Sequence, residues 1–125
     1  MTEIEQKEKT LPIEENGQYK NISLKQKWDE GTLVRDGLAD GEYIIVEKTN
    51  FVEGRAVNTQ YGTSYSCGVK YNNEDVNFWL DEKEHTKYAE TGGLGDKVKI
   101  LNLKETFIYN KIEKKKNVLH FSVVQ

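Results

Sequence analysis

The chain has 125 residues, a length that suits one domain. Hydrophobic residues make up 36% of it and charged residues 31%, which is too apolar for a fully disordered chain but leaves room for one unstructured segment. The net charge of −3 combines an acidic start, with five glutamates and two lysines over 1–15, and a basic end, with seven lysines and three acidic residues over 96–125. This balance excludes a strongly basic duplex binder and permits a local basic groove.

The first part of the chain predicts a flexible acidic arm over residues 1–20, followed by a folded domain over 21–125. The arm is rich in Glu, Lys, Gln and Thr, has few aromatic residues and contains the only proline, Pro12. It is either a plain tail or an arm that binds a protein partner or regulates the protein itself. Residues 21–41 have a mixed pattern, and a short helix or an extended segment that packs Trp28 onto the domain would both fit.

Three strands are predicted from residue 42 onward. Residues 42–48 are β-branched and aromatic, which is typical of a strand. The runs 65–71 and 76–80 alternate with period two on either side of a polar turn at 72–75. We expect these two runs to form a hairpin.

A short helix is predicted next, over about 82 to 90. Asp81 can cap its first turn, and Glu84 follows three residues later, as in a capping box. Glycines 92 and 93 end it.

Two further strands are predicted at the C-terminal end. Residues 97–103 alternate, and 107–109 extend this strand after a bend. Residues 110–117 are interpreted as a lysine-rich turn, and 118–124 as the last strand.

The residues and motifs of enzyme chemistry are scarce. Cys67 is the only cysteine, and His85 and His120 are distant in sequence, so neither a disulfide nor a zinc pattern is available. P-loop and G-x-S-x-G motifs are absent. No apolar run approaches the roughly 18 residues of a membrane span, and the first residues do not resemble a signal peptide. We therefore expect a cytoplasmic non-enzyme with no catalytic residues, metal, cofactor or membrane contact.

The order of strand, hairpin, short helix and two strands resembles the OB-fold, an all-β, five-stranded Greek-key barrel with a helix between its third and fourth strands. The runs 94–100 and 78–81 are similar to the start of the fourth strand and the passage into the helix in domains of the replication protein A and single-stranded-DNA-binding class. The likeness covers residues 41–125. A single-barrel protein of archaeal, plasmid or phage type fits better than a bacterial tetrameric one, because no acidic C-terminal peptide is present.

This resemblance implies binding of single-stranded DNA, or of RNA, on the outer face of the second and third strands. If Val76, Phe78 and Leu80 point inward, Asn77 and Trp79 point outward. Trp79 near Lys70 would then form a stacking platform with a cation, or Trp79 would pack internally. The remaining candidate binding residues lie at the strand ends and in the loops: Arg55, Tyr61, Tyr65, Lys111, Lys114 and Lys115.

Two function classes compete. The first is non-specific single-stranded DNA binding in replication, recombination or repair. The second is a protein-interaction subunit without a nucleic-acid role, which the neutral body and the acidic arm favour. RNA binding would use the same surface as DNA binding, because the 2′-hydroxyl is the chemical difference.

Overall fold

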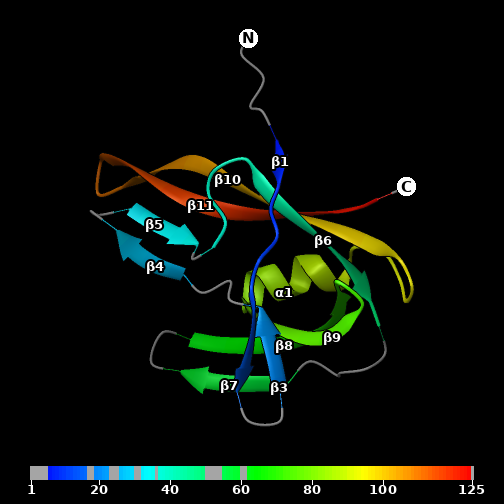
Figure 1. Cartoon of the computed structure of the whole chain (residues 1–125). Coiled ribbons are helices and arrows are strands. Elements are labelled where there is room, and N and C mark those ends of the chain that lie inside the picture. The colour runs from blue at the N-terminus through cyan, green and yellow to red at the C-terminus, as the bar shows by residue number, and fades with distance from the viewer. Residues whose placement is uncertain are drawn as a thin grey trace.

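The computed structural model describes residues 6–16, 19–22, 26–29, 32–35, 37–49, 55–59 and 62–124. Within these ranges the chain forms eleven strands and one helix (Figure 1). Their bounds, in chain order, are β1 (Lys7–Glu8), β2 (Ile13–Asn16), β3 (Tyr19–Ile22), β4 (Gln26–Asp29), β5 (Thr32–Arg35), β6 (Glu42–Lys48), β7 (Arg55–Thr59), β8 (Gly62–Tyr71), β9 (Glu74–Asp81), α1 (Glu82–Ala89), β10 (Lys97–Tyr109) and β11 (Ile112–Val123).

The β8–β9 hairpin confirms the prediction made from its alternating pattern. Its turn consists of Asn72 and Asn73, whose φ angles of 50° and 62° lie in the left-handed region. Two such residues form the turn whose twist matches that of the flanking strands, and asparagine tolerates this conformation better than most residues. Val69, Val76 and Phe78 alternate along the hairpin with no solvent exposure, so they form the centre of the core.

The predicted helix is also confirmed, with its capping box. The Glu84 backbone N–H donates to Asp81 Oδ1 at 2.8 Å, and the Asp81 backbone N–H donates to Glu84 Oε1 at 3.0 Å. These two bonds satisfy donors that a helix start leaves unpaired. At the other end the Lys48 ammonium donates to the carbonyls of Tyr88 and Thr91, both at 3.0 Å. A cation there also suits the helix dipole.

The strands form one sheet in the order β2-β3-β9-β8-β6-β10-β11-β5-β4, with β1 attached to β6 and β7 to β8. The prediction of a mostly β protein with one short helix is therefore confirmed. The sheet is not closed into the predicted barrel. In the part of the chain that the structure describes, β9 pairs with β3 at its edge away from β8, and β11 pairs with β5 at its edge away from β10. N-terminal strands thus occupy the edges that closure would require.

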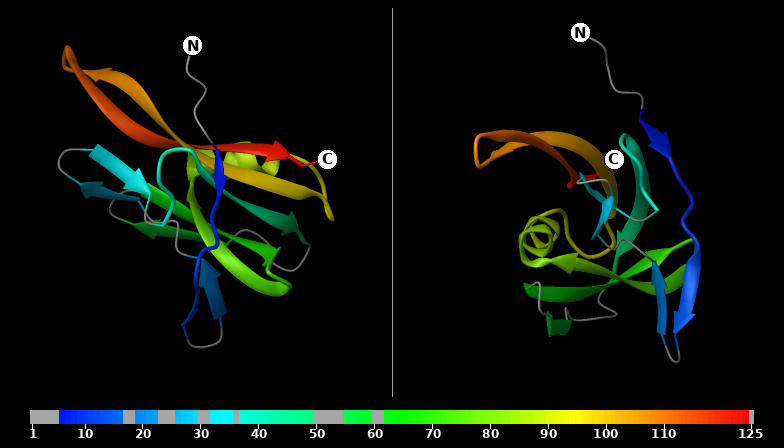
Figure 2. Two further views of the ribbon diagram at one scale, coloured as in Figure 1. Left: turned by 45° about the horizontal axis from the view of Figure 1, so that its top comes forward. Right: turned by 90° about the vertical axis from the view of Figure 1, so that its left-hand side faces the viewer.

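The helix lies between the two ends of the core sheet. Figure 2 (right) shows α1 end-on, with β10–β11 on one side and β8–β9 on the other. The Tyr88 ring meets Phe78 of β9 edge-on at 5.3 Å between centroids, and meets Phe121 of β11 at 5.7 Å. Edge-on pairs of this kind contribute about 0.5–1.5 kcal/mol beyond their buried area. Tyr88 thus joins β9 to β11 through the core instead of through a strand ladder.

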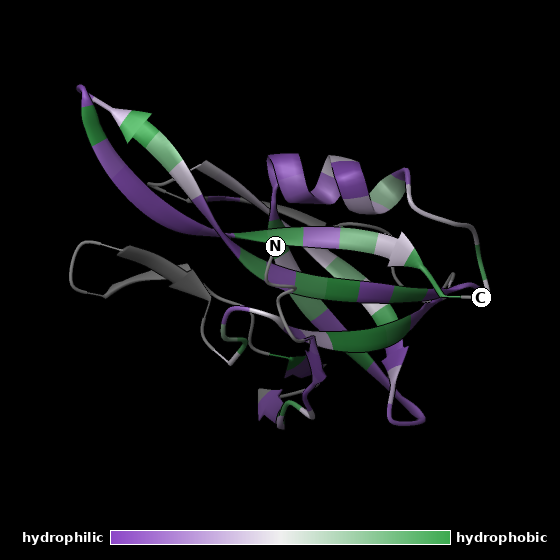
Figure 3. Cartoon of the chain, turned by 90° about the horizontal axis from the view of Figure 1, so that it is seen from above, coloured by the Kyte–Doolittle hydropathy of each residue, from purple (hydrophilic) through white to green (hydrophobic). Residues whose placement is uncertain are grey.

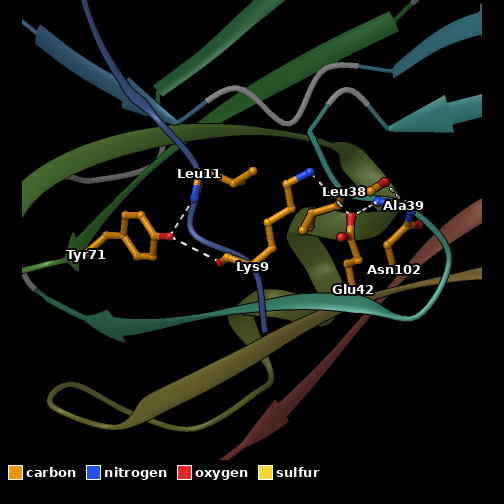
Figure 4. A network of polar contacts seen from close by, with 7 residues as sticks. All are labelled: Lys9, Leu11, Leu38, Ala39, Glu42, Tyr71 and Asn102. Carbon is orange, nitrogen blue, oxygen red and sulfur yellow. Dashed lines mark hydrogen bonds and ion pairs between the residues drawn. The ribbon is translucent and has the colours of Figure 1, made fainter. Parts of the chain in front are cut away.

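The N-terminal segment runs along the body, whereas the sequence predicts a flexible arm there. β1 pairs in parallel with β6, and Leu11 is 2% exposed in the core. The Leu11 backbone N–H donates to the Tyr71 hydroxyl at 2.9 Å, and this hydroxyl donates to the Lys9 carbonyl at 3.5 Å (Figure 4). Isolated apolar residues in a polar segment give no periodic signal, so this docking is a tertiary effect that the sequence pattern does not reveal.

The loop before β6 is fixed by a second set of contacts, on the other side of Figure 4. The Asn102 side-chain amide donates to the Leu38 carbonyl at 2.8 Å, and Leu38 is 1% exposed. The Glu42 carboxylate accepts from the Ala39 backbone N–H at 2.6 Å and lies 3.6 Å from the Lys9 ammonium. The loop therefore joins the N-terminal segment to the middle of β10.

Candidate nucleic-acid interface

The distal halves of β10 and β11 form a long hairpin that projects from the body (Figures 1 and 2). From here on, the arm means the part from Lys104 to Lys116, and not the acidic N-terminal segment 1–20. Its turn is formed by Asn110 and Lys111, with φ angles of 50° and 63°. Because both angles are left-handed, the chain reverses within two residues and the strands pair up to Tyr109 and Ile112.

This geometry corrects the prediction of a lysine-rich turn over 110–117. Lys111 lies in the turn and is exposed, whereas Lys114 and Lys115 lie in β11, opposite Phe107 and Thr106. The sequence suggests a loop because lysines are common in exposed turns. The two-residue turn instead leaves those lysines in the ladder, where alternate ones project to opposite faces of the arm.

One face of the arm combines aromatic rings with cations. Phe107 lies directly opposite Lys114, and Tyr109 and Lys116, each two residues further along its own strand, share that face with them. The Lys114 ammonium is 5.1 Å from the centroid of the Tyr109 ring, and the Lys116 ammonium is 5.3 Å from that of Phe107. A cation within about 6 Å of a ring centroid is attracted to the π face of that ring. Tyr109 is still 58% exposed.

Phe107 and Tyr109 were not among the candidate residues predicted from the sequence. The signal that identifies them is their spacing of two residues, directly before an Asn-Lys turn, with lysines following at the same spacing. At the base of the arm the Glu105 carboxylate lies 2.7 Å from His120 Nε2. From Lys104 to Lys116 the arm contains five lysines and two glutamates, so its net charge is positive.

The outer face of β8 and β9 is less open than the sequence predicts. Asn77 lies on the side opposite Phe78 as expected, but it is 6% exposed, and Ser66 is 5% exposed. Gly68, opposite Asn77, is buried as well. Asn77 therefore lies on the outer face as predicted, but it is buried there and closed to solvent. β3 pairs with β9 at this position, which places the backbone of Asn21 beside Asn77.

One polar atom of the Asn77 side chain lacks a partner: Oδ1 is buried without a hydrogen bond among the described residues. Trp79 is half-buried, and Lys70 is exposed opposite Asp75. Of the predicted platform, Trp79 and Lys70 remain in contact with solvent.

Tyr65 lies away from that outer face. It alternates with Cys67 and Val69 on the inner side of β8, and its ring stacks on His85 of α1 at 4.3 Å with an interplanar angle of 13°. The structure thus places Tyr65 against the helix, where His85 covers one of its ring faces. Arg55 lies in β7 opposite Ser66, but its side chain and all of Tyr61 are outside the described residues.

The one cysteine is placed for packing. Cys67 is 4% exposed, and burial raises the pKa of its thiol to about 12, with the Lys48 ammonium opposing the shift. A buried thiol with a raised pKa is a poor nucleophile. Desolvation likewise lowers the pKa of Lys48. Among the residues that the structure describes, no cluster of His, Cys, Asp and Glu has the makings of a metal site.

Comparisons with known proteins give no match: no family model, no curated protein and no solved structure resembles this chain significantly. In the described ranges, no helix has the length and apolarity to span a bilayer.

Proposed function

We propose that this chain is an OB-type domain that binds single-stranded DNA without sequence specificity, mainly through the arm, in cytoplasmic replication, recombination or repair. The fold part of this proposal is supported by the core order β9-β8-β6-β10-β11 with α1 between β9 and β10. This is the order expected of an OB barrel left open between its third and fifth strands, and OB barrels are often partly open.

The observation that carries the function is the face of the arm on which Phe107 and Tyr109 lie beside Lys114 and Lys116. Non-specific single-strand binding requires aromatic faces for the bases and cations for the phosphates. Every base has a π face, so stacking contributes about 1–3 kcal/mol per base with little regard to sequence. In OB-folds the hairpin between the fourth and fifth strands borders the binding groove, and β10–β11 is that hairpin in the proposed fold.

The direct test is a titration of a labelled dT oligomer of roughly 16 nucleotides with the whole chain. Fluorescence anisotropy of the label reports binding anywhere on the protein. Tryptophan quenching reports contact near Trp79 or Trp28. We expect a saturable rise in anisotropy that weakens with salt. A flat titration at low salt, with no mobility shift, would contradict the proposal.

RNA binding uses the same chemistry, so the titration is repeated with competing unlabelled rU and dT oligomers of equal length. We expect dT to compete at least as well as rU. Preferential competition by rU would assign the surface to RNA, because the 2′-hydroxyl is what separates the two.

A protein-interaction role is favoured by one observation, the exposure of apolar residues on the arm: Ile108 is 76% exposed and Ile112 59%. Exposed apolar residues at a projecting tip can contact a protein partner. Pull-down from nuclease-treated extract separates the two functions. A stoichiometric partner that survives nuclease, together with a flat oligomer titration, would replace our proposal with this one.

A further inference from the structure

The outer edge of β10 changes character along its length. Near the body, the loop before β6 provides hydrogen-bond partners for the backbone groups of this edge. The Asn102 carbonyl accepts from the Gly41 backbone N–H at 2.7 Å, and the Lys104 backbone N–H donates to Asp40 Oδ1 at 2.7 Å. Even-numbered residues of this part of β10 therefore point their backbone groups away from β11.

Beyond Lys104 no described residue provides such a partner for the edge. By the same alternation, the N–H and C=O groups of Thr106 and Ile108 point outward. In the described part of the chain, β10 pairs with β6 over Lys97–Leu101, and from there to the tip it pairs only with β11. The opposite edge of the arm differs, because β11 pairs with β5 at Lys116.

The side chains of the two strands of the arm also differ, in charge and in hydropathy. The tip of β10, from Thr106 to Tyr109, contains no charged residue and consists of β-branched and aromatic residues. The lysines of the arm beyond Lys104 lie in the turn and in β11. Figure 3 shows this contrast as a green end of β10 beside a mostly purple β11. An exposed, uncharged and apolar strand edge is a template for pairing with another chain.

We propose that this edge is a homodimer interface: β10 of one copy pairs with β10 of a second copy in antiparallel orientation, which extends the arm into a four-stranded ribbon. The unpaired groups define the register. Thr106 of each copy would exchange hydrogen bonds with Ile108 of the other, and the two Phe107 side chains would face each other across the two-fold axis. Isologous contacts of this kind are the commonest in soluble oligomers.

A second copy fits this edge because the segment is self-complementary. In the proposed register Glu105 lies opposite Tyr109, so no like charges face each other. A cross-strand aromatic pair at the axis adds attraction. The β11 lysines of the two copies lie on the two outer strands, with both β10 strands between them. Asp40 caps Lys104 and so limits the pairing to the tip.

The test compares proline substitutions at the two members of one cross-strand pair. Ile108 and Glu113 lie opposite each other, and both point their backbone N–H groups away from the partner strand. Proline is tolerated at such edge positions because the lost N–H is not part of the hairpin ladder. Ile108→Pro removes a donor from the proposed interface, and Glu113→Pro is the matched control on the other edge.

The association of each protein is measured by sedimentation velocity over a range of protein concentrations, without nucleic acid. We expect a concentration-dependent dimer for the natural sequence and Glu113→Pro, and a dissociation constant raised about tenfold or more for Ile108→Pro. Ile108→Lys, which keeps the backbone donor and adds a charge at the edge, should also weaken the dimer. A natural chain that stays monomeric, or equal effects of the two prolines, would overturn the proposal.

This inference does not depend on nucleic-acid binding. A dimer that fails to bind an oligomer would leave the interface in place and contradict only the proposed function. A monomer that binds an oligomer would do the reverse.

Discussion

The β8–β9 hairpin and the β10–β11 arm are both antiparallel pairs closed by two left-handed residues, yet they face different environments. One side of β8–β9 is in the core, and much of its other side is buried too, as at Ser66 and Asn77. The arm has exposed residues on both sides, such as Ile108 and Tyr109. The same alternating pattern therefore forms part of the core in one hairpin and an exposed surface in the other.

The largest difference should be in stability. Phe78→Ala, in the β8–β9 hairpin, removes a fully buried ring and should lower the free energy of unfolding by about 3–5 kcal/mol. Phe107→Ala, in the arm, should lower it by less than about 1 kcal/mol, because the ring is half-exposed and is not one of the residues packed in or against the core cluster. Urea denaturation followed by circular dichroism measures both. Equal losses would show that the arm is part of the cooperative core.

The next effect concerns base stacking. Tyr109→Ala should weaken dT oligomer binding by about 1–3 kcal/mol, because it removes an exposed ring that a base can cover. Ile112→Ala is the matched control, since Ile112 is the cross-strand neighbour of Tyr109 and similarly exposed. Anisotropy titrations compare the two variants. A greater loss for Ile112→Ala would indicate general apolar contact in place of stacking.

The third prediction compares the loss of lysine charge on the arm with the same loss on α1. Changing Lys114 and Lys116 to Gln should reduce the slope of log affinity against log salt by roughly 0.7 for each lost phosphate contact. The same change at Lys83 and Lys87, which are exposed on α1, removes equal charge away from the arm. Titrations at several salt concentrations give the slopes. Similar slopes for both double variants would argue against a local phosphate site on the arm.

The smallest expected effect is at the outer face of β8–β9. Trp79→Ala should weaken oligomer binding by less than Tyr109→Ala does, because Trp79 is half-buried and its neighbours Gly68 and Asn77 are closed to solvent. A loss of affinity larger than that of Tyr109→Ala would indicate that β8–β9, and not the arm, makes the main contact with the oligomer. The same titration measures this loss, and circular dichroism verifies that the variant is folded.

Local patterns predicted the elements that depend on local chemistry. The Asp81–Glu84 capping box, the β8–β9 alternation and β6 are all set by residues close in sequence. Features that depend on distant contacts were not predictable. The docking of Leu11, the burial of Asn77 beside β3 and the stacking of Tyr65 on His85 each require a partner remote in the chain.

The arm falls between these cases. The sequence predicts its strands and lysines, but it predicts too long a turn, because nothing in the composition of 110–117 indicates that Asn110 and Lys111 alone reverse the chain. A turn of that length takes the lysines out of the strand ladder, so it does not predict that Phe107 and Tyr109 share a face with Lys114 and Lys116. The register of a hairpin depends on the length of its turn, so an error in the turn becomes an error in the candidate site.

The measurement that tests the central claim most directly is a pair of anisotropy titrations of the same dT oligomer, one with the natural chain and one with the Phe107→Ala, Tyr109→Ala double variant. Our account predicts saturable, salt-sensitive binding by the natural chain and a loss of most of that affinity in a double variant that remains folded. Undiminished binding by the double variant, or no binding by the natural chain, would contradict it.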